Sequence, residues 1–317
     1  MNEILNRIHK IGIMPVAVLD DVKNAVPLAE ALCGGGIHCV EIPLSTNAAE
    51  ESIRIMTERF PQMLIGAGDI LTAAQASLAV NAGAKFIVSP EFSSSVVKYC
   101  IDRAIPVIPG VSTPDDVETA ISFGLDAVKV SSAGQDRGLH MNQTTYSSYN
   151  HINFIPADGI NEKNSNSYPA FDNILACNFM VEQELIQAGE FEKIHELTAK
   201  AIQTMLGFEF THIGINLSTD EEAEKTAGIF EAMFGFQKRS GAGSIFAGTA
   251  IECMKPPYFG TKGHIAIATN SIVRAKNYFE TAGYKFNEAS AKFNHDKMIV
   301  IYFEEEVGGF AVHILQR

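Results

Sequence analysis

Two charged residues stand within short apolar runs, where the strand pattern predicts burial. Lys129 lies in the run 126–131, and Glu41 lies in the run 39–44. Because strand side chains alternate in direction, both charges point away from the apolar residues of their own strand. An amine held away from water is a nucleophile that can form a Schiff base with a ketone, and a facing carboxylate can move its protons. The alternative is a structural ion pair.

A second group of candidate residues follows an internal repeat near the C-terminus. His212 and His264 begin equivalent strands, and Glu252 and His313 occupy equivalent places in the last strand of each repeat. Each is the polar member of an otherwise apolar alternation. One such histidine is more often a core residue, but four ligand-type side chains at repeat-related positions predict a metal site. Three nitrogens and one oxygen suit Zn, Ni, Mn or Fe.

The first two hundred residues alternate between short apolar runs and helical periods, which predicts a (β/α)8 TIM barrel. The predicted strands are 13–19, 38–44, 63–67, 85–89, 105–109, 126–131, 152–156 and 173–178. The predicted helices include 22–32, 48–60, 73–82, 93–103 and 114–123. Catalytic groups in this fold lie at the C-terminal ends of the strands. Glu41 on the second strand and Lys129 on the sixth would therefore face each other inside the barrel.

A long helix over 190–206 ends the barrel, and residues 207–209 form the hinge into a second domain. Each repeat there starts with a strand and a helix and continues in short strands. The predicted segments are 211–215, 221–234, 244–246 and 250–254, and then 263–267, 272–281, 298–303 and 310–315. Two βαβββ modules predict a small, curved α+β sheet that could enclose a site. We therefore place the domains at residues 1–207 and 208–317, as the length of 317 residues suggests.

Composition narrows the class of protein. The net charge of −13 and the pI near 5.1 argue against nucleic acid or an anionic membrane as a partner. No apolar run is long enough to span a bilayer, and the N-terminus lacks an apolar signal core. The five cysteines are scattered in apolar contexts, which is typical of reduced thiols. We expect a cytoplasmic protein that acts on a small molecule.

Residues 1–205 resemble the class I 2-keto-3-deoxy-6-phosphogluconate (KDPG) and 2-keto-4-hydroxyglutarate (KHG) aldolases along their whole length. The resemblance is carried by Lys129 and by the blocks 40–42, 65–68, 86–90, 108–113, 155–160 and 187–191. It implies that Lys129 forms the Schiff base with pyruvate or another 2-keto acid and that Glu41 is the acid/base. It also implies a trimer and a barrel that needs no metal or other cofactor.

The pocket that the resemblance places around the substrate departs in part from the family pattern. Its residues are Ser45, Asp69, Pro90, Ala157, Asp158, Gly159 and Asn178. Asp69 replaces a threonine that helps to hold the substrate carboxylate, and Ser45 stands where many members have an arginine. The stretch 157–159 and Asn178 replace turns that receive anions. Because like charge near an anion is unfavourable, Asp69 and Asp158 favour a substrate without phosphate, such as 4-hydroxy-2-oxoglutarate.

Residues 210–317 resemble the vicinal-oxygen-chelate superfamily, which includes glyoxalase I, epimerases and extradiol dioxygenases. The resemblance implies a divalent metal held by His212, Glu252, His264 and His313, although the fourth ligand is often glutamate in that superfamily. The four side chains could meet within one chain or between two chains, and the second arrangement would add dimer contacts.

Three functions fit these residues. The first is a Schiff-base lyase that cleaves a 2-keto-4-hydroxy acid, of the 4-hydroxy-2-oxoglutarate or 2-dehydro-3-deoxy-phosphogluconate type, to pyruvate and an aldehyde. The second is an inactive or repurposed barrel whose metal domain acts as a glyoxalase, epimerase or dioxygenase. The third is a barrel trimer that only presents ligand-binding domains. Intact Lys129 and Glu41 favour the first function, and the four ligands speak against the third.

Overall fold

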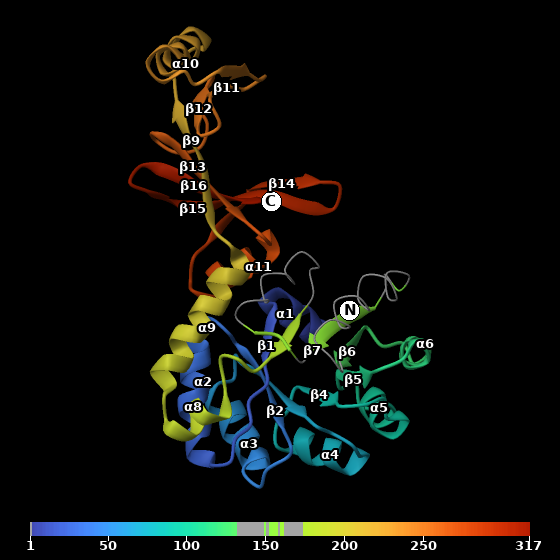
Figure 1. Ribbon diagram of the computed structural model, residues 1–317. Coiled ribbons are helices and arrows are strands. Elements are labelled where there is room, and N and C mark those ends of the chain that lie inside the picture. The colour runs from blue at the N-terminus through green and yellow to red at the C-terminus, as the bar shows by residue number, and fades with distance from the viewer. Residues whose placement is uncertain (1, 132–148, 150–151, 158, 162–173) are drawn as a thin grey trace. The chain divides into compact units, whose positions relative to one another are not determined.

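The computed structural model describes residues 2–131, 149, 152–157, 159–161 and 174–317. The chain divides into two compact units, Met1–Met205 and Leu206–Arg317. Each unit has its own sheet and its own helices (Figure 1). Among the described residues, the helices are too short or too polar to cross a membrane.

Eight parallel strands form the centre of the first unit. They are β1 (Ile13–Pro15), β2 (Cys39–Pro43), β3 (Leu64–Gly68), β4 (Phe86–Ser89), β5 (Val107–Val111), β6 (Ala127–Ser131), β7 (Asn153–Ala157) and β8 (Leu175–Cys177). Strands β2 to β7 make one ladder, and β1 pairs with β8. The residues after β1 join the two groups, because Val16 N donates to Cys177 O and Ala17 N donates to Glu41 O. Between β7 and β8 no pairing occurs among the described residues. The unit therefore has a TIM-barrel-like α/β fold.

Helices surround the ring of strands in this unit, and α1 (Glu3–Ile11) packs over one end of it (Figure 1). The helices are α1, the 3₁₀ turn η1 (Val22–Asn24), α2 (Ala25–Gly34), α3 (Ala49–Arg59), α4 (Ala73–Asn81), α5 (Ser94–Ile101), α6 (Pro114–Ser122), α8 (Gln183–Ala188) and α9 (Phe191–Leu206). The sequence did not predict α1 or α8 as helices. The predicted helix at 22–32 is split, because Pro27 has no N–H to bond the Lys23 carbonyl and the α-helix begins only at Ala25.

The interior of the ring is packed with apolar side chains from alternate strand positions. This layer includes Met14, Cys39, Leu64, Phe86, Val88, Ile108, Ala127 and Ile155, and Leu5 and Ile8 of α1 join it. Val128 and Val130 belong instead to an outer layer with Val117 and Ala120 of α6. The alternation therefore turns Lys129 in the same direction as Ala127, into the ring.

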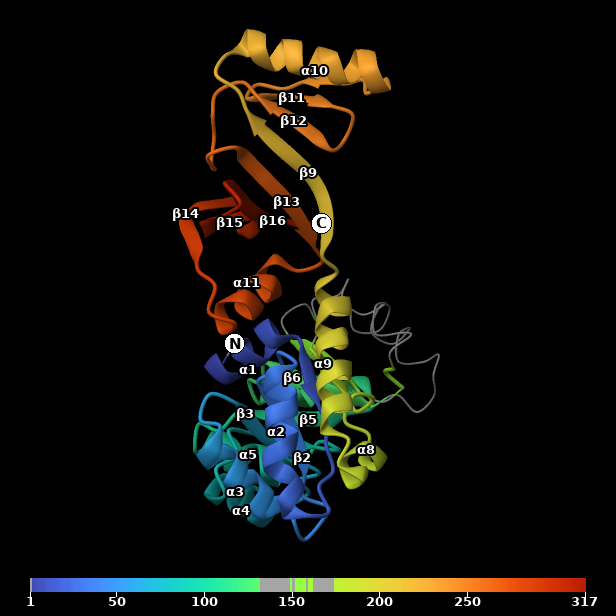
Figure 2. The ribbon, with the colours of Figure 1, turned by 90° about the vertical axis from the view of Figure 1, so that its left-hand side faces the viewer.

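The second unit is one eight-stranded sheet in the order β10-β11-β12-β9-β13-β16-β15-β14. Its first module is β9 (Glu209–Asn216), α10 (Asp220–Phe234), β10 (Lys238–Ser240), β11 (Ser244–Ala247) and β12 (Ile251–Met254). Its second module is β13 (Gly263–Thr269), α11 (Ile272–Thr281), β14 (Phe286–Asn294), β15 (Lys297–Val307) and β16 (Phe310–Gln316). The two modules join through the antiparallel pair β9 and β13. Figure 2 shows α10 lying across β11 and β12.

Both modules have the predicted βαβββ order, but two of their strands lie in residues that were not predicted as strands. These are β10 and β14, and they are the two edges of the sheet. Polar residues and bulges are usual on edge strands because they discourage pairing with other chains. β10 has only the sequence Lys-Arg-Ser, and the pairing of β14 with β15 shifts twice. Neither strand therefore shows a clear apolar alternation.

Candidate functional sites

The amine of Lys129 meets the carboxylate of Glu41 inside the first unit. Lys129 Nζ donates to Glu41 Oε1 at 3.0 Å and to Oε2 at 3.1 Å. The Glu41 side chain is 2% exposed, whereas that of Lys129 is 14% exposed. The carboxylate is therefore enclosed, while the amine keeps some contact with solvent. A small molecule could reach the amine from the open side of the pair.

Glycines make the space for this pair. A Cβ at Gly68, on the strand next to Glu41, would lie 2.4 Å from Glu41 Oε1. Gly110 pairs with Lys129 in the ladder, and a Cβ there would lie 2.1 Å from the carbonyl oxygen of Pro90. The backbone of Pro90 thus packs against the strand beside Lys129. The absence of side chains at these two positions lets the neighbouring groups approach closely.

Most of the other predicted substrate residues follow strand ends on the same side of the ring. Ser45 comes shortly after β2 and Asp69 directly after β3, and both residues are exposed. The two ends are adjacent, since Leu44 N donates to Gly68 O. Asp69 has a left-handed φ of 54°, which aspartate tolerates better than most residues. A carboxylate therefore stands at the rim beside the strand that packs on Glu41.

The remaining predicted substrate residues lie at the ends of β7 and β8. Ala157 ends β7 and is buried, and it pairs with Ser131, two positions after Lys129. Gly159 and Asn178 are exposed. Asp158 lies outside the described residues. The parallel ladder places all the described strand ends at one edge of the sheet.

The first unit matches the family model described as KDPG and KHG aldolase over residues 4–197. The chain belongs to the KDPG and KHG aldolase family. It is 36% identical to a 2-dehydro-3-deoxy-phosphogluconate aldolase of Treponema pallidum over 205 residues, which cover 64% of this chain and 98% of that protein. It is 30% identical to a KHG/KDPG aldolase of Escherichia coli K12, over 60% of this chain and 91% of that protein. Such relatives are lyases, and the chain is an enzyme of this class.

A solved structure shows the same similarity. The KDPG aldolase of Legionella pneumophila, crystallised with pyruvate captured as a covalent carbinolamine, aligns with a TM-score of 0.60 and 30% identity. The alignment covers 63% of this chain and 98% of that one. Hereafter Met1–Met205 is called the aldolase unit, and Leu206–Arg317 is called the C-terminal unit.

The C-terminal unit brings its four predicted ligands together within one chain, through two rows that cross the sheet. In the first row Glu252 and His264 flank Gly214, and in the second row His212 and His313 flank Ala266. A Cβ at Gly214 would lie 2.0 Å from the His264 ring, so only glycine leaves room there. Because the middle residue of each row is small, the long side chains on either side meet above it.

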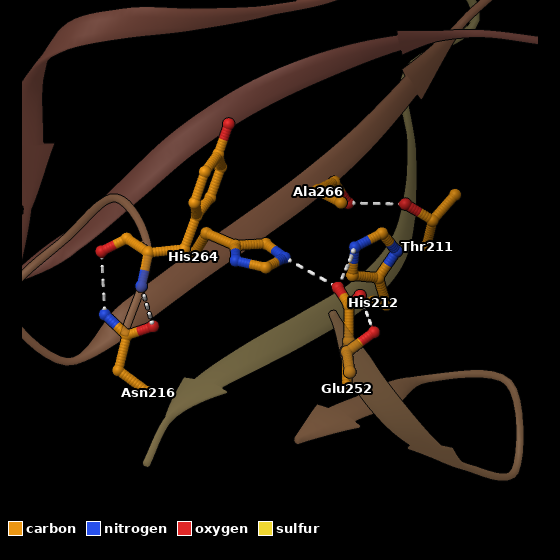
Figure 3. Close-up of polar contacts among 8 residues, drawn as sticks. Thr211, His212, Asn216, Glu252, His264 and Ala266 are labelled. Atoms are coloured by element: carbon orange, nitrogen blue, oxygen red, sulfur yellow. Dashed lines mark hydrogen bonds and ion pairs between the residues drawn. The ribbon is translucent and has the colours of Figure 1, made fainter. Parts of the chain in front are cut away.

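The four side chains form one polar cluster in an apolar sheet. His264 Nε2 lies 3.0 Å and His212 Nε2 lies 3.3 Å from Glu252 Oε2 (Figure 3). Ser244 Oγ donates to Glu252 Oε1 at 2.6 Å. Burial opposes ionisation of Glu252, but the hydrogen bonds from His212, His264 and Ser244 outweigh it, so the pKa of this carboxyl lies well below its usual range. Glu252 is therefore a carboxylate.

His313 completes the cluster as a neutral imidazole. Burial, together with the nearby side chains of His264, His212 and Lys292, lowers the pKa of His313 to about 3, and the opposing effect of the Glu252 carboxylate is smaller. Neither of its ring nitrogens has a hydrogen-bond partner among the described residues, and neither does His264 Nδ1. One ligand atom from each of His212, His264 and His313 lies within 4.8 Å of the others.

These features fit a divalent cation. A buried imidazole without a partner is costly, and a metal ion supplies the partner that the protein does not. Neutral imidazole and carboxylate are also the forms that ligate metals. The donor set suits a transition metal better than Ca²⁺ or Mg²⁺, which prefer oxygen ligands.

Aromatic residues that were not predicted from the sequence surround this cluster. Tyr302 pairs with His313 across β15 and β16, and their rings stack at 4.4 Å. Phe246 pairs with Glu252 in the equivalent place of the first module and contacts the ring of His212 at 5.5 Å. The signal that could have located both is the repeat itself, which puts an aromatic residue beside the last-strand ligand of each module.

Proposed function

We propose that the aldolase unit cleaves a 2-keto-4-hydroxy acid to pyruvate and an aldehyde through a Schiff base on Lys129. The observation that carries the proposal is the contact of both Glu41 carboxylate oxygens with the Lys129 amine, at 3.0 and 3.1 Å. A lysine can attack a carbonyl only after it loses a proton, and the carboxylate at this distance is a base that can accept it.

The steps follow from this pair. Glu41 takes a proton from Lys129, and the free amine adds to the C2 carbonyl of the substrate. Glu41 returns the proton to the hydroxyl of the carbinolamine, water leaves, and a protonated imine (iminium) to Lys129 remains. Loss of the proton from the C4 hydroxyl to Glu41 then breaks the C3–C4 bond, which releases the aldehyde and leaves an enamine. Protonation at C3 and addition of water release pyruvate and restore the amine.

Asp69 supports a substrate without phosphate. Its carboxylate is exposed at the end of β3, directly after the glycine that packs on Glu41. A phosphate carries more negative charge than a carboxylate, so a carboxylate at the rim disfavours phosphate more strongly. We therefore propose 4-hydroxy-2-oxoglutarate as the type of substrate, ahead of 2-dehydro-3-deoxy-phosphogluconate.

Borohydride trapping tests the Schiff base. The full chain is incubated with pyruvate and sodium borohydride, and peptide mass mapping locates the reduced adduct. We expect the adduct on Lys129 and none in Lys129→Ala. Absence of an adduct with pyruvate and with other 2-keto acids would overturn the proposal. A coupled assay of pyruvate release then compares the two substrates, and faster release from the phosphorylated one would overturn the role of Asp69.

The family resemblance further supports a trimer formed through the barrel. Light scattering on the purified chain would give about 103 kDa for three copies of the 34.4 kDa chain. A mass of one or two chains would contradict the trimer and leave the Schiff base untouched.

A second candidate function is supported by the histidine cluster. We propose that the C-terminal unit is a metal-binding domain of the vicinal-oxygen-chelate type, with His212, Glu252, His264 and His313 as ligands. The bound ion would act as a Lewis acid on the oxygens of a substrate. Glu252 and Ser244 would hold His212 and His264 in place, since the carboxylate contacts both imidazoles.

Titration with Co²⁺ or Zn²⁺ tests this function. We expect about one ion per chain. His313→Ala should weaken binding strongly. A chain that binds no ion, as judged by elemental analysis after dialysis, would refute the metal site and would say nothing against the aldolase unit.

A further inference from the structure

A fixed aromatic wall stands beside the histidine cluster of the C-terminal unit. The loop between β12 and β13 carries Tyr258 and Phe259, and Asn216 of β9 holds it. Asn216 Nδ2 donates to the carbonyl oxygen of Tyr258 at 3.0 Å, and Tyr258 N donates to Asn216 Oδ1 at 2.9 Å (Figure 3). Asn216 Nδ2 also donates to the carbonyl oxygen of Gly260 at 2.7 Å. Asn216 lies two residues after Gly214, so it projects from the same face of β9 as the cluster.

The loop has little freedom to move away. Gly260 has a left-handed φ of 86°, and a Cβ there would lie 1.9 Å from Gly263 O and 2.5 Å from Ala311 N. Its backbone therefore packs directly on the ends of β13 and β16. Three hydrogen bonds from one side chain and this close packing fix the position of Tyr258 and Phe259.

The rings form a continuous surface from the cluster outward. Phe259 and Tyr258 contact Tyr302 with ring centroids 4.8 and 6.1 Å apart, and Tyr302 stacks on His313. Tyr258 is 40% exposed, so it forms the outer end of the wall. A ligand that reaches His313 must pass along these rings or rest against them.

A lysine lies over the outer end of this wall. Lys292 Nζ is 5.4 Å from the centre of the Tyr258 ring, within the range of a cation–π contact. Lys292 pairs with Val300 of β15, two residues from Tyr302, so its side chain lies on the cluster side of the sheet.

The charges at this site favour an anion. A divalent ion and Lys292 together would carry three positive charges, whereas Glu252 is the one acidic side chain that contacts the histidines of the cluster among the described residues. The excess of positive charge lies on the side of the aromatic wall. On the opposite side of the cluster, Ser244 and the imidazoles of His212 and His264 already contact the Glu252 carboxylate. A ligand with a carboxylate at its Lys292 end would match this distribution.

We propose that the C-terminal unit binds a small carboxylate that carries a second oxygen on the adjacent carbon, namely a 2-oxo or 2-hydroxy acid, and that Lys292 selects for its carboxylate. This inference rests on the proposed metal site, whose open positions would take two neighbouring oxygens. The 2-oxo acids are also the class of product that the proposed aldolase reaction releases. The C-terminal unit would then belong to a reaction that consumes or rearranges such an acid.

The test measures the affinity of oxalate for the full chain loaded with Co²⁺. Oxalate has two adjacent carboxylates and cannot form a Schiff base, and the visible absorption of Co²⁺ reports only on the metal site. We expect Lys292→Met to bind oxalate about tenfold more weakly than the wild type at low salt, and Lys292→Arg to retain the affinity. The difference should shrink in 0.5 M NaCl, because salt screens an exposed charge (a Debye length of roughly 4 Å).

Lys297→Met is the matched control, since Lys297 is an exposed lysine of the same hairpin and pairs with Asn294 at its far end. It should bind oxalate as the wild type does. Neutral imidazole should bind all variants equally. If Lys292→Met binds Co²⁺ and oxalate as well as the wild type, the role of Lys292 is refuted while the metal site stands. If neither the wild type nor any variant shows the absorption spectrum of bound Co²⁺, the metal site itself is refuted.

Discussion

Substitution of Gly68 by alanine should disable the aldolase unit through one methyl group. The new Cβ would lie 2.4 Å from Glu41 Oε1, 2.9 Å from its Cγ and 3.0 Å from its Cδ. Ordinary contacts between such atoms begin near 3.4 Å, so the carboxylate must move by about 1 Å. It has little room to do so, because its side chain is 2% exposed and both oxygens are hydrogen-bonded to Lys129.

The expected loss can be worked from this displacement. A shift of about 1 Å in a catalytic group costs about 10²-fold in rate, which corresponds to about 2.7 kcal/mol of transition-state stabilisation. The loss of stability should be of similar size, about 1–3 kcal/mol, as for other added methyl groups in packed interiors. Gly68 has no left-handed backbone angle, so the effect comes from the contact with Glu41.

The assay is the rate of borohydride-trapped pyruvate adduct on Lys129, measured well below the unfolding temperature. Gly228→Ala in α10 is the matched control, because a Cβ there meets no atom within 4 Å and alanine favours helix by up to about 1 kcal/mol. Gly66→Ala is a second comparison, since its Cβ would meet the Phe86 ring at 2.2 Å and should destabilise the core instead. A folded Gly68→Ala chain that traps pyruvate at the wild-type rate would refute the role of Glu41 as the proton carrier.

Three further predictions concern stability. Lys129→Met removes the ammonium beside a buried carboxylate and should lower the free energy of unfolding by about 3 kcal/mol. The double variant Lys129→Met, Glu41→Gln should recover most of this loss, because no buried charge is then left without a partner. If urea unfolding shows the same loss of stability for the single and the double variant, this prediction is contradicted. Burial raises the pKa of Cys177 to about 12, so above the unfolded thiol pKa of about 8.5 the native state keeps a proton that the unfolded state loses. Stability should therefore fall as pH rises from about 9 to 12, and a Cys177→Ala chain whose stability falls equally steeply would disprove the assignment. Zn²⁺ at a hundred times its Kd should stabilise the C-terminal unit by about 2.7 kcal/mol, reversibly with EDTA, and calorimetry of His313→Ala should show no such gain.

The strands of the aldolase unit could be read from the sequence because each is a short apolar run between helical periods. The strand predicted at 126–131 is observed at Ala127–Ser131, and the helix predicted at 114–123 is observed at Pro114–Ser122. The direction of Lys129 also followed from alternation alone, since its neighbours are valines. That Lys129 and Glu41 touch depends on how the sheet of β2 to β7 curves to bring β6 opposite β2, which no local pattern contains. The contact of Gly68 with Glu41 likewise depends on the register between β2 and β3.

The positions of the four metal-binding side chains in the C-terminal unit could be predicted from the repeat. The strand pairing that brings these side chains together was not predicted. Each module begins with His-Ile followed by a small residue, Gly214 in the first and Ala266 in the second. Because Gly214 and Ala266 are small, they leave space above the sheet in which the metal-binding side chains of the neighbouring strands meet. The residues outside the repeat, Lys292 and the Tyr258 loop, gave no periodic signal. They are brought to the cluster by an edge strand and by one asparagine side chain.

The repeat and its exceptions have different consequences for a bound ligand. Repeat-related residues place the metal-binding side chains symmetrically. Two identical modules would therefore give a site in which a bound small molecule has no preferred orientation. Here the equivalent positions hold Glu252 in one module and His313 in the other, and Tyr302 replaces Phe246 as the paired aromatic residue. Negative charge therefore lies at one end of the cluster, and a neutral imidazole with Lys292 beyond it lies at the other. An anionic ligand can bind favourably in only one orientation, with its carboxylate toward the second module, and this asymmetry gives the site its direction.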